Sequence, residues 1–350
     1  MNKIYSVQYL RGIAALIVVI SHSFDYRLLN HNYDALRSGR FGVLLFFLIS
    51  GFIMVAITGK GRLDPLQFLV RRFLRVVPLY WIMTTLVAAA AIVAPHWFKN
   101  TQFSTSHYIL SLLFVPHETP GREGLSPMLS LGWTLNYEIY FYIVFSALFF
   151  LSAKLRVFSI SLIFTLLFLI GEIFPNLPLV LQFYTDQAPL AFCFGAGIGL
   201  AYIEGSIKPS KNLLLPLSVS ALCLTVGFGI ERGSSGGLWV FTMLLVSAAL
   251  ILIAGLRYEN LIPKVPALQL LGDSSYSIYL AHMFVVGAFT SIAYRFLPAD
   301  ALWAIIAVTI GSTLFSIAGG LVVFFMVERP LVGFFNSAKR KPVANAPRQI

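Results

Sequence analysis

Apolar residues run along this chain in long blocks, and short polar or basic segments separate the blocks. Ten blocks are about twenty residues long, enough to cross the ~30 Å hydrocarbon core of a bilayer as helices. The predicted helices cover residues 5–24, 41–58, 78–95, 131–151, 156–174, 188–205, 212–230, 238–256, 276–297 and 301–327. The pattern therefore predicts an all-α, polytopic integral membrane protein with about ten transmembrane helices.

The composition agrees with this pattern. Of the 350 residues, 58% are apolar and 11% are charged, whereas soluble domains are about 45–50% apolar and about 25% charged. A water-soluble globule is excluded. The longest polar stretch, residues 95–130, contains the apolar run Tyr108–Val115, and we expect a structured extramembrane loop there. We expect one transmembrane domain over residues 1–333 and a basic, disordered cytoplasmic tail over residues 334–350.

The basic residues predict the topology. The net charge is +11, and 17 Lys and Arg residues lie on the side that holds both termini, against 7 on the other side. The positive-inside rule places both termini in the cytoplasm. Because these residues cluster beside helix ends, their excess indicates topology and contact with membrane lipids rather than a nucleic-acid surface.

The first apolar block contains two ionisable residues, Arg11 and His22, although a charge in hydrocarbon costs several kcal/mol. Eleven residues at about 100° each place both side chains on one helix face, about 16 Å apart along the axis. In one interpretation, Arg11 snorkels to the headgroups and His22 is merely interfacial. In the other, which we favour, both belong to a catalytic site, because a neutral imidazole is a suitable general base near pH 7.

A carboxylate is predicted at the depth of His22. Glu138 lies seven residues into the fourth helix, which runs inward, and is therefore about 10 Å deep. Tyr142 shares its face at the i, i+4 spacing, and Asn136 is close in sequence. An aromatic belt would explain the neighbouring tyrosines but not the acidic residue. We expect Glu138 to orient the imidazole, with Asn136 and Tyr142 lining the site.

The densest basic cluster is Arg71, Arg72 and Arg75, directly before the third predicted helix, which Pro78 would begin or kink. Arg72 and Arg75 share a face at the i, i+3 spacing. The cluster is either a positive-inside anchor or a binding site for phosphate groups, which guanidinium forks bind well.

The ninth helix begins in the segment Asp273, Ser274 and Ser275, whose side-chain oxygens are possible N-caps. His282 follows nine residues after Asp273, which places it about 14 Å further along the helix axis. Both are expected as further residues lining the site, although core packing would explain His282 equally well.

Other kinds of chemistry are not indicated. Cys193 and Cys223 lie in apolar blocks, where Cys behaves as a small hydrophobe. The loop histidines His96, His107 and His117 lack the spacing of metal ligands, and we expect no metal. Neither standard Gly-rich phosphate loop occurs, which argues against an ATP-driven protein.

Six blocks in order resemble the acyltransferase-3 family over nearly the whole chain. The blocks are RGIAALIVVISH (Arg11–His22), FFLISGFIM (Phe46–Met54), RRFLRVVPLYW (Arg71–Trp81), LGWTLNYEIYFY (Leu131–Tyr142), LGDSSYSIYLAH (Leu271–His282) and VERP (Val327–Pro330). The resemblance implies an O-acyltransferase of the bacterial cytoplasmic (inner) membrane, in the exopolysaccharide-modifying branch. Its expected donor is acetyl-CoA or another acyl-CoA, and its expected acceptor is a glycan or lipid-linked saccharide.

The resemblance also implies residue roles. Arg11 and His22 match the family's Arg-and-His motif, and Arg72 and Arg75 match its paired-Arg motif. The resulting hypothesis is that the arginines bind the phosphates of acyl-CoA on the inside, while His22 takes a proton from a glycan hydroxyl on the outside. Direct transfer is favoured over an acyl-histidine intermediate. The alternative functions are a polyprenyl-linked glycan transporter or flippase, and a membrane sensor or scaffold.

Overall fold

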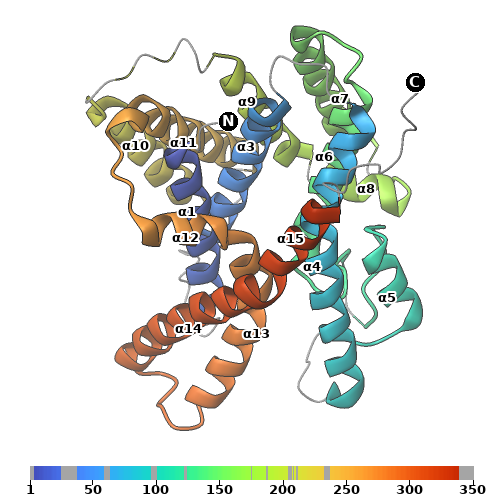
Figure 1. The fold of residues 1–350 in the computed structure, drawn as a ribbon. Helices are drawn as coiled ribbons and strands as arrows, with labels where there is room; N and C mark the ends of the chain where they lie inside the picture. Colours follow the sequence, from blue (N-terminus) through green and yellow to red (C-terminus); the bar gives the residue numbers. More distant parts are fainter. Residues whose placement is uncertain are drawn as a thin grey trace, which may run out of the picture.

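The protein is described here from a computed structural model (Figure 1). The structure describes residues 4–24, 38–58, 64–95, 101–121, 124–174, 176–186, 188–203, 207, 209, 212–231 and 237–338. The regular structure in these ranges is helical, and no strand occurs in them. The predicted all-α fold class is confirmed.

Each of the ten predicted segments contains a helix, and further short helices lie between them (Figure 1). The helices are α1 (Tyr5–Ser23), α3 (Ser38–Thr58), α4 (Pro65–Val93), α5 (Thr105–Leu112), α6 (Gly132–Ala147), α7 (Ala153–Ile173), α8 (Leu179–Asp186), α9 (Ala188–Ile203), α10 (Leu214–Glu231), α11 (Gly237–Tyr258), α12 (Pro266–Asp273), α13 (Ser275–Ala293), α14 (Leu302–Val323) and α15 (Arg329–Ala338). A 3-10 turn, η4, covers Glu259–Leu261, and a π-helical turn, η5, covers Phe324–Glu328.

Many of these helices have the dimensions and surface of membrane spans. Within the described residues, 7 helices are long and apolar enough to cross a bilayer, while α6, α9 and the apolar part of α10 are shorter. On α7, exposed apolar side chains recur every three or four residues, as a lipid-facing stripe requires. This stripe comprises Leu155, Phe158, Leu162, Leu166, Leu169 and Ile173. The protein is a polytopic membrane protein, and its total of ten spans stays a prediction.

Helix α4 begins 13 residues earlier than the sequence pattern predicted, so the predicted start at residue 78 is wrong and, of the two interpretations of Pro78, the helix entry does not apply. The carboxylate of Asp64 accepts a hydrogen bond from the amide of Leu66, and Pro65 occupies the first helical turn. Both are strong signals for a helix start. Pro78 instead lies inside the helix. The arginine cluster is therefore carried on a regular helix rather than on a connecting loop.

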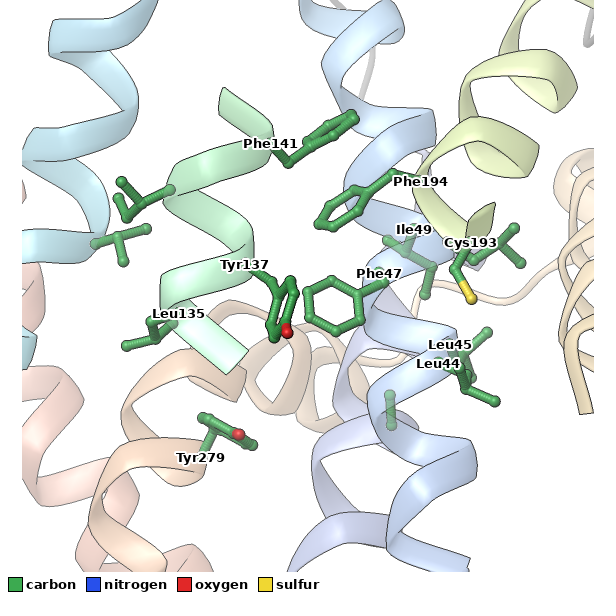
Figure 2. Packing of buried hydrophobic residues seen from close by; sticks show 14 of the residues in the cluster. Leu44, Leu45, Phe47, Ile49, Leu135, Tyr137, Phe141, Cys193, Phe194 and Tyr279 are labelled. Atoms are coloured by element: carbon green, nitrogen blue, oxygen red, sulfur yellow. The ribbon is translucent and has the colours of Figure 1, made fainter. Parts of the chain in front are cut away.

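Aromatic packing fixes α6 against its neighbours. The rings of Phe141 and Phe194 stack with centroids 3.8 Å apart, and Phe47 of α3 lies 4.7 Å from Phe194 (Figure 2). The helix ends at Ala147, and the guanidinium group of Arg156 donates hydrogen bonds to carbonyl groups that follow it, which satisfies part of the helix C-terminus. The carboxylate and tyrosine side chains on α6 are thus held at a defined depth.

Helix α12 sets the position at which α13 begins. A Cβ atom at Gly272 would collide with the carbonyl oxygen of Gln8, so α12 can pack this closely on α1 only with glycine there. The carboxylate of Glu259 accepts hydrogen bonds from the amides of Tyr5 and Ser6 and thereby caps α1. Since η4 follows α11 directly, the start of α1 and the end of α11 lie on one side of the protein.

The C-terminal helices differ from the predicted boundaries. A π-helical turn joins α14 to α15, and the chain stays helical through Ala338, five residues into the predicted disordered tail. The rest of that tail, residues 339–350, lies outside the described residues.

Candidate functional site

A cavity of about 570 Å³ lies between α1, α3, α4, α6 and α13. Helix α1 contributes only its first half to the wall, from Ile4 to Arg11. The arginines of the cluster contribute from the first half of α4. The cavity therefore lies toward the side of the membrane that the sequence predicts to be cytoplasmic.

The wall of this cavity carries three guanidinium groups and one carboxylate, from Arg11, Arg72, Arg75 and Glu138. Arg72 is 9% exposed, and its Nη2 atom is buried without a hydrogen-bond partner. Its guanidinium carbon lies 5.6 Å from the ring centroid of Phe68 and 5.9 Å from that of Tyr142. A buried, unsatisfied guanidinium nitrogen is costly, so the arrangement favours an anionic ligand. Arg71, in contrast, is exposed and does not line the cavity.

Glu138 lies in the cavity wall but does not contact His22. Its carboxylate accepts hydrogen bonds from the hydroxyl groups of Tyr142 and Ser50, the latter at 3.4 Å. The expectation that Glu138 orients the imidazole has no support in these contacts. The reason is geometric: α6 begins beside Tyr80, in the middle of α4, and not beside either end of that helix. Glu138, the seventh residue of α6, therefore lies at the level of the arginines rather than at the end of α1 that carries His22.

His22 has a different partner, His282 of α13. The Nε2 atom of His282 lies 3.4 Å from the Nδ1 atom of His22, and the ring centroids are 5.1 Å apart. The two rings belong to residues 260 positions apart in the chain. The sequence indicated both residues separately, and the structure brings them together.

Backbone carbonyl groups assign the protons of this pair. The Nδ1 atom of His22 lies 2.9 Å from the carbonyl oxygen of Val18, and that of His282 lies 2.6 Å from the carbonyl oxygen of Tyr279. A carbonyl oxygen only accepts, so both Nδ1 atoms carry the proton when the rings are neutral. The Nε2 atom of His22 is then unprotonated, and it has no hydrogen-bond partner among the described residues.

Tyr279 stands between the cavity and the histidine pair. It lines the cavity, its carbonyl group holds His282, and its ring lies 5.9 Å from that of His282. Its hydroxyl group is 2.8 Å from that of Thr134, which donates its own proton to the carbonyl group of Leu131. The hydroxyl group of Tyr279 also lies 3.4 Å from this carbonyl oxygen, so the two hydroxyl groups and the Leu131 carbonyl form one hydrogen-bonded cluster. Neither histidine lines the cavity, so these two hydroxyl groups mark its limit toward His22.

Two other predicted site residues lie outside the cavity wall. Asp273 ends α12 and accepts a hydrogen bond from the side-chain amide of Gln8, so among the three N-cap candidates it is not the residue that precedes α13. The cap position belongs to Ser274, whose hydroxyl group donates back to Leu270. Asn136 is buried on α6, away from the cavity. Among the predicted site residues, those that line the cavity are Arg11, Arg72, Arg75, Glu138 and Tyr142.

Sequence reasoning missed Glu328. This residue ends the π-helical turn η5, is buried, and accepts a hydrogen bond of 2.5 Å from the hydroxyl group of Ser277. π-helical turns inside helices are often found at functional sites. The available signal was the VERP block, which contains an acidic residue at the end of an apolar run.

A second histidine pair, also missed, lies in the 95–130 region. The Nδ1 atom of His107 is 2.6 Å from the Nε2 atom of His117, whose own Nδ1 donates to the carbonyl group of Val115. Burial, and secondly the neighbouring His117, lower the pKa of His107 to about 4. In the part of the chain that the structure describes, no three His, Cys, Asp or Glu side chains are grouped as metal ligands.

Comparisons with known proteins agree on one family. The model of the family Acyl_transf_3, described as an acyltransferase domain, matches residues 4–321. The exopolysaccharide production protein ExoZ of Rhizobium meliloti is 33% identical over 298 residues, which are 84% of this chain and 90% of ExoZ. The peptidoglycan O-acetyltransferase OatA of Listeria monocytogenes is 26% identical over 153 residues, which are 41% of this chain and 23% of OatA. No solved structure matches the chain.

Proposed function

The chain belongs to the acyltransferase-3 family, and from that premise we propose that it transfers an acyl group from cytoplasmic acyl-CoA to a hydroxyl group of an envelope or exported glycan. Acetyl is the acyl group we propose. The site would lie in the bacterial inner membrane, with the donor entering from the cytoplasm. One observation carries the proposal: a cavity with three unpaired guanidinium groups lies next to a histidine pair, with Tyr279 between them.

The donor's phosphate groups would bind the guanidinium side of the cavity. Arg72 and Arg75 project from one face of α4, and Arg11 faces them from α1. None of the three forms an ion pair or hydrogen bond within the described residues, and the carboxylates of Glu138 and Glu328 accept hydrogen bonds from hydroxyl groups instead. Guanidinium groups bind phosphate through paired, charge-assisted hydrogen bonds. Cytoplasmic acyl-CoA carries such phosphates at one end and a narrow pantetheine arm at the other.

The thioester would pass Tyr279 and reach His22. Arg11 and His22 are about 16 Å apart along α1, a distance that an extended pantetheine arm can cover. The Nε2 atom of His22 takes the proton of the glycan hydroxyl as its oxygen attacks the thioester carbonyl carbon. The carbon–sulfur bond then breaks, and the proton on His22 passes to the leaving sulfur, which gives the free thiol of CoA and an O-acyl ester. Positioned base catalysis of this kind accelerates a reaction about 10²–10⁴-fold.

The acceptor class follows from the relatives. ExoZ is named for exopolysaccharide production and OatA for peptidoglycan O-acetylation, and both names support a glycan hydroxyl as the acceptor. Family membership also favours a transferase over the glycan transporter and the scaffold, which need no acyl donor.

Mass spectrometry of the cell's exported polysaccharides tests the function. Cells that have the gene should contain O-acyl esters that cells without it lack, and membranes that contain the protein should transfer labelled acetyl from acetyl-CoA to the extracted polysaccharide. Identical ester content with and without the gene, together with no transfer of label, would rule the proposal out. Export of the unmodified glycan that depends on the gene would support the transporter instead.

A further inference from the structure

The proposed function leaves open what holds the base, because Glu138 contacts Tyr142 and Ser50 instead of His22. We propose that His282 is the positioning residue for His22: a neutral imidazole whose unprotonated Nε2 atom accepts the Nδ1–H group of His22 during proton transfer. The proposal rests on the role of His22 as the base in the proposed function.

The proton positions of the pair follow from its backbone contacts. The carbonyl group of Tyr279 fixes the proton of His282 on Nδ1, which leaves a lone pair on Nε2. That lone pair lies 3.4 Å from the Nδ1 atom of His22, whose proton already points to the carbonyl oxygen of Val18 at 2.9 Å. The Nδ1–H group of His22 is thus shared between two acceptors. Its Nε2 atom is left as the free base.

Protonation of His22 would strengthen the longer of its two contacts, the one of 3.4 Å between its Nδ1 atom and the Nε2 atom of His282. When the Nε2 atom of His22 takes the substrate proton, the ring becomes a cation and its Nδ1–H group becomes a stronger donor. Hydrogen bonds to charged groups are shorter and stronger than neutral ones. Catalytic hydrogen bonds are also often long in the free enzyme and shorten in the reacting complex. An acceptor that gains most from the cationic state stabilises the transition state more than the resting state.

The surroundings explain why the acceptor is neutral. His282 is 0% exposed, and the described residues give neither ring a carboxylate or guanidinium partner. The titratable group in contact with His22 among the described residues is His282 alone. A carboxylate buried there would be charged in the resting state without compensation, at a high desolvation cost. A second imidazole supplies the acceptor without that cost.

Packing holds His282 in place. Helix α12 approaches α1 closely at Gly272, which brings the start of α13 beside α1. Gly320 of α14 lies against Ile278, one turn before His282, where a Cβ atom would collide with the Ile278 side chain, and Ile278 also packs on α1. The part of α13 that carries His282 is therefore packed against both α1 and α14, as a positioning residue requires.

Two substitutions of the full-length protein in lipid test this role. His282→Phe keeps an aromatic ring but removes the acceptor, and His282→Gln keeps an amide oxygen that can accept. We expect His282→Phe to lower kcat about tenfold to hundredfold, to leave the KM for acetyl-CoA unchanged, and to move the acid limb of the pH–rate profile to lower pH. His282→Gln should restore part of kcat. His107→Phe is the matched control, since it removes a buried imidazole from the other histidine pair, which does not line the cavity.

The results separate this inference from the proposed function. Wild-type kcat and an unchanged pH profile in His282→Phe would overturn the positioning role, as would equal defects in the Phe and Gln variants with an unchanged pH profile. If His282→Phe does not fold, His282→Leu, which also lacks an acceptor, takes its place: wild-type kcat with an unchanged pH profile in that variant contradicts the proposal. Full activity of His22→Gln would instead overturn the role of His22 as the base in the proposed function.

Discussion

The two histidine pairs have the same hydrogen-bonding pattern but different surroundings. In each pair, a backbone carbonyl group holds the Nδ1–H group of one ring, and the Nε2 atom of that ring faces the Nδ1 atom of the other. The pair His107–His117 joins α5 to the segment that follows it. The pair His22–His282 joins α1 to α13 and touches Tyr279 of the cavity wall.

The difference shows that a histidine pair alone does not make a site. His107 gives its Nδ1–H group to His117 at 2.6 Å, in a region tied to α4 by hydrogen bonds from Tyr80 and Trp81 to carbonyl groups of α5. This pair stabilises a loop region. His22 shares its Nδ1–H group between two acceptors and lies beyond a cavity with an excess of guanidinium groups. The neighbouring cavity, rather than the imidazoles, distinguishes the second pair.

The largest expected effect separates the two pairs directly. His22→Gln should lower acyl transfer about 10²–10⁴-fold, because the base is lost. His107→Gln should leave kcat within about twofold, because its pair lies away from the cavity wall. Transfer of labelled acetyl by equal amounts of folded protein measures both. Comparable losses in the two variants would remove the distinction between the pairs.

The paired arginines should act on donor binding. Arg72→Gln and Arg75→Gln should each raise the KM for acetyl-CoA about tenfold to hundredfold, because each removes a charge-assisted hydrogen bond to phosphate. Arg71→Gln is the matched control: it lies on the same helix but is exposed and outside the cavity wall. Steady-state kinetics with varied acetyl-CoA measure the effect. An equal rise in KM for Arg71→Gln would indicate a general charge effect.

The contact between the hydroxyl groups of Tyr279 and Thr134 should protect the thioester of bound acetyl-CoA from hydrolysis by water. Tyr279→Phe removes this bond of 2.8 Å, and we expect hydrolysis of acetyl-CoA relative to transfer to rise about twofold to tenfold. Release of free CoA without acceptor measures hydrolysis. Tyr9→Phe removes a hydroxyl group that contacts Pro263 and Val265, outside the cavity wall, and serves as the control. An unchanged ratio in Tyr279→Phe would show that the contact does not separate the two.

The smallest effect concerns stability and pH. Folding lowers the pKa of His107 from 6.5 to about 4, so between these values the unfolded chain binds more protons. The stabilisation from neutral His107 is therefore complete above about pH 6.5 and decreases as the pH falls toward about 4. His107→Asn, which can still donate to His117, should flatten this dependence. Thermal unfolding at several pH values measures it, and an unchanged slope in the variant would contradict the assignment.

The fold could be predicted from the sequence because a bilayer allows few solutions. Long apolar blocks must form helices there, since backbone groups find no partners in hydrocarbon. The boundaries were less predictable. Residues 65–77 are polar enough to resemble a loop, yet Asp64 and Pro65 start α4 there. The start of α6 at mid-depth depends on contacts with Tyr80, which the local pattern does not reveal.

The site was predictable as a set of residues but not as a set of pairs. An ionisable side chain in an apolar block is a candidate site residue because its burial in hydrocarbon costs free energy. This criterion identified Arg11, His22 and His282. Partners depend on how distant helices pack. His22 and His282 meet because α12 packs on α1, while Glu138 is turned toward the arginines by the position of α6.

The central claim is that the guanidinium cavity and His22 belong to one path for the acyl donor. A structure of the protein in lipid with a non-hydrolysable thioether analogue of acetyl-CoA tests this most directly. The account predicts phosphate groups against Arg72 and Arg75, and the acyl carbonyl group beyond Tyr279, next to the Nε2 atom of His22. An analogue that binds elsewhere, or whose acyl end stays on the arginine side with the Tyr279–Thr134 contact intact, would contradict it.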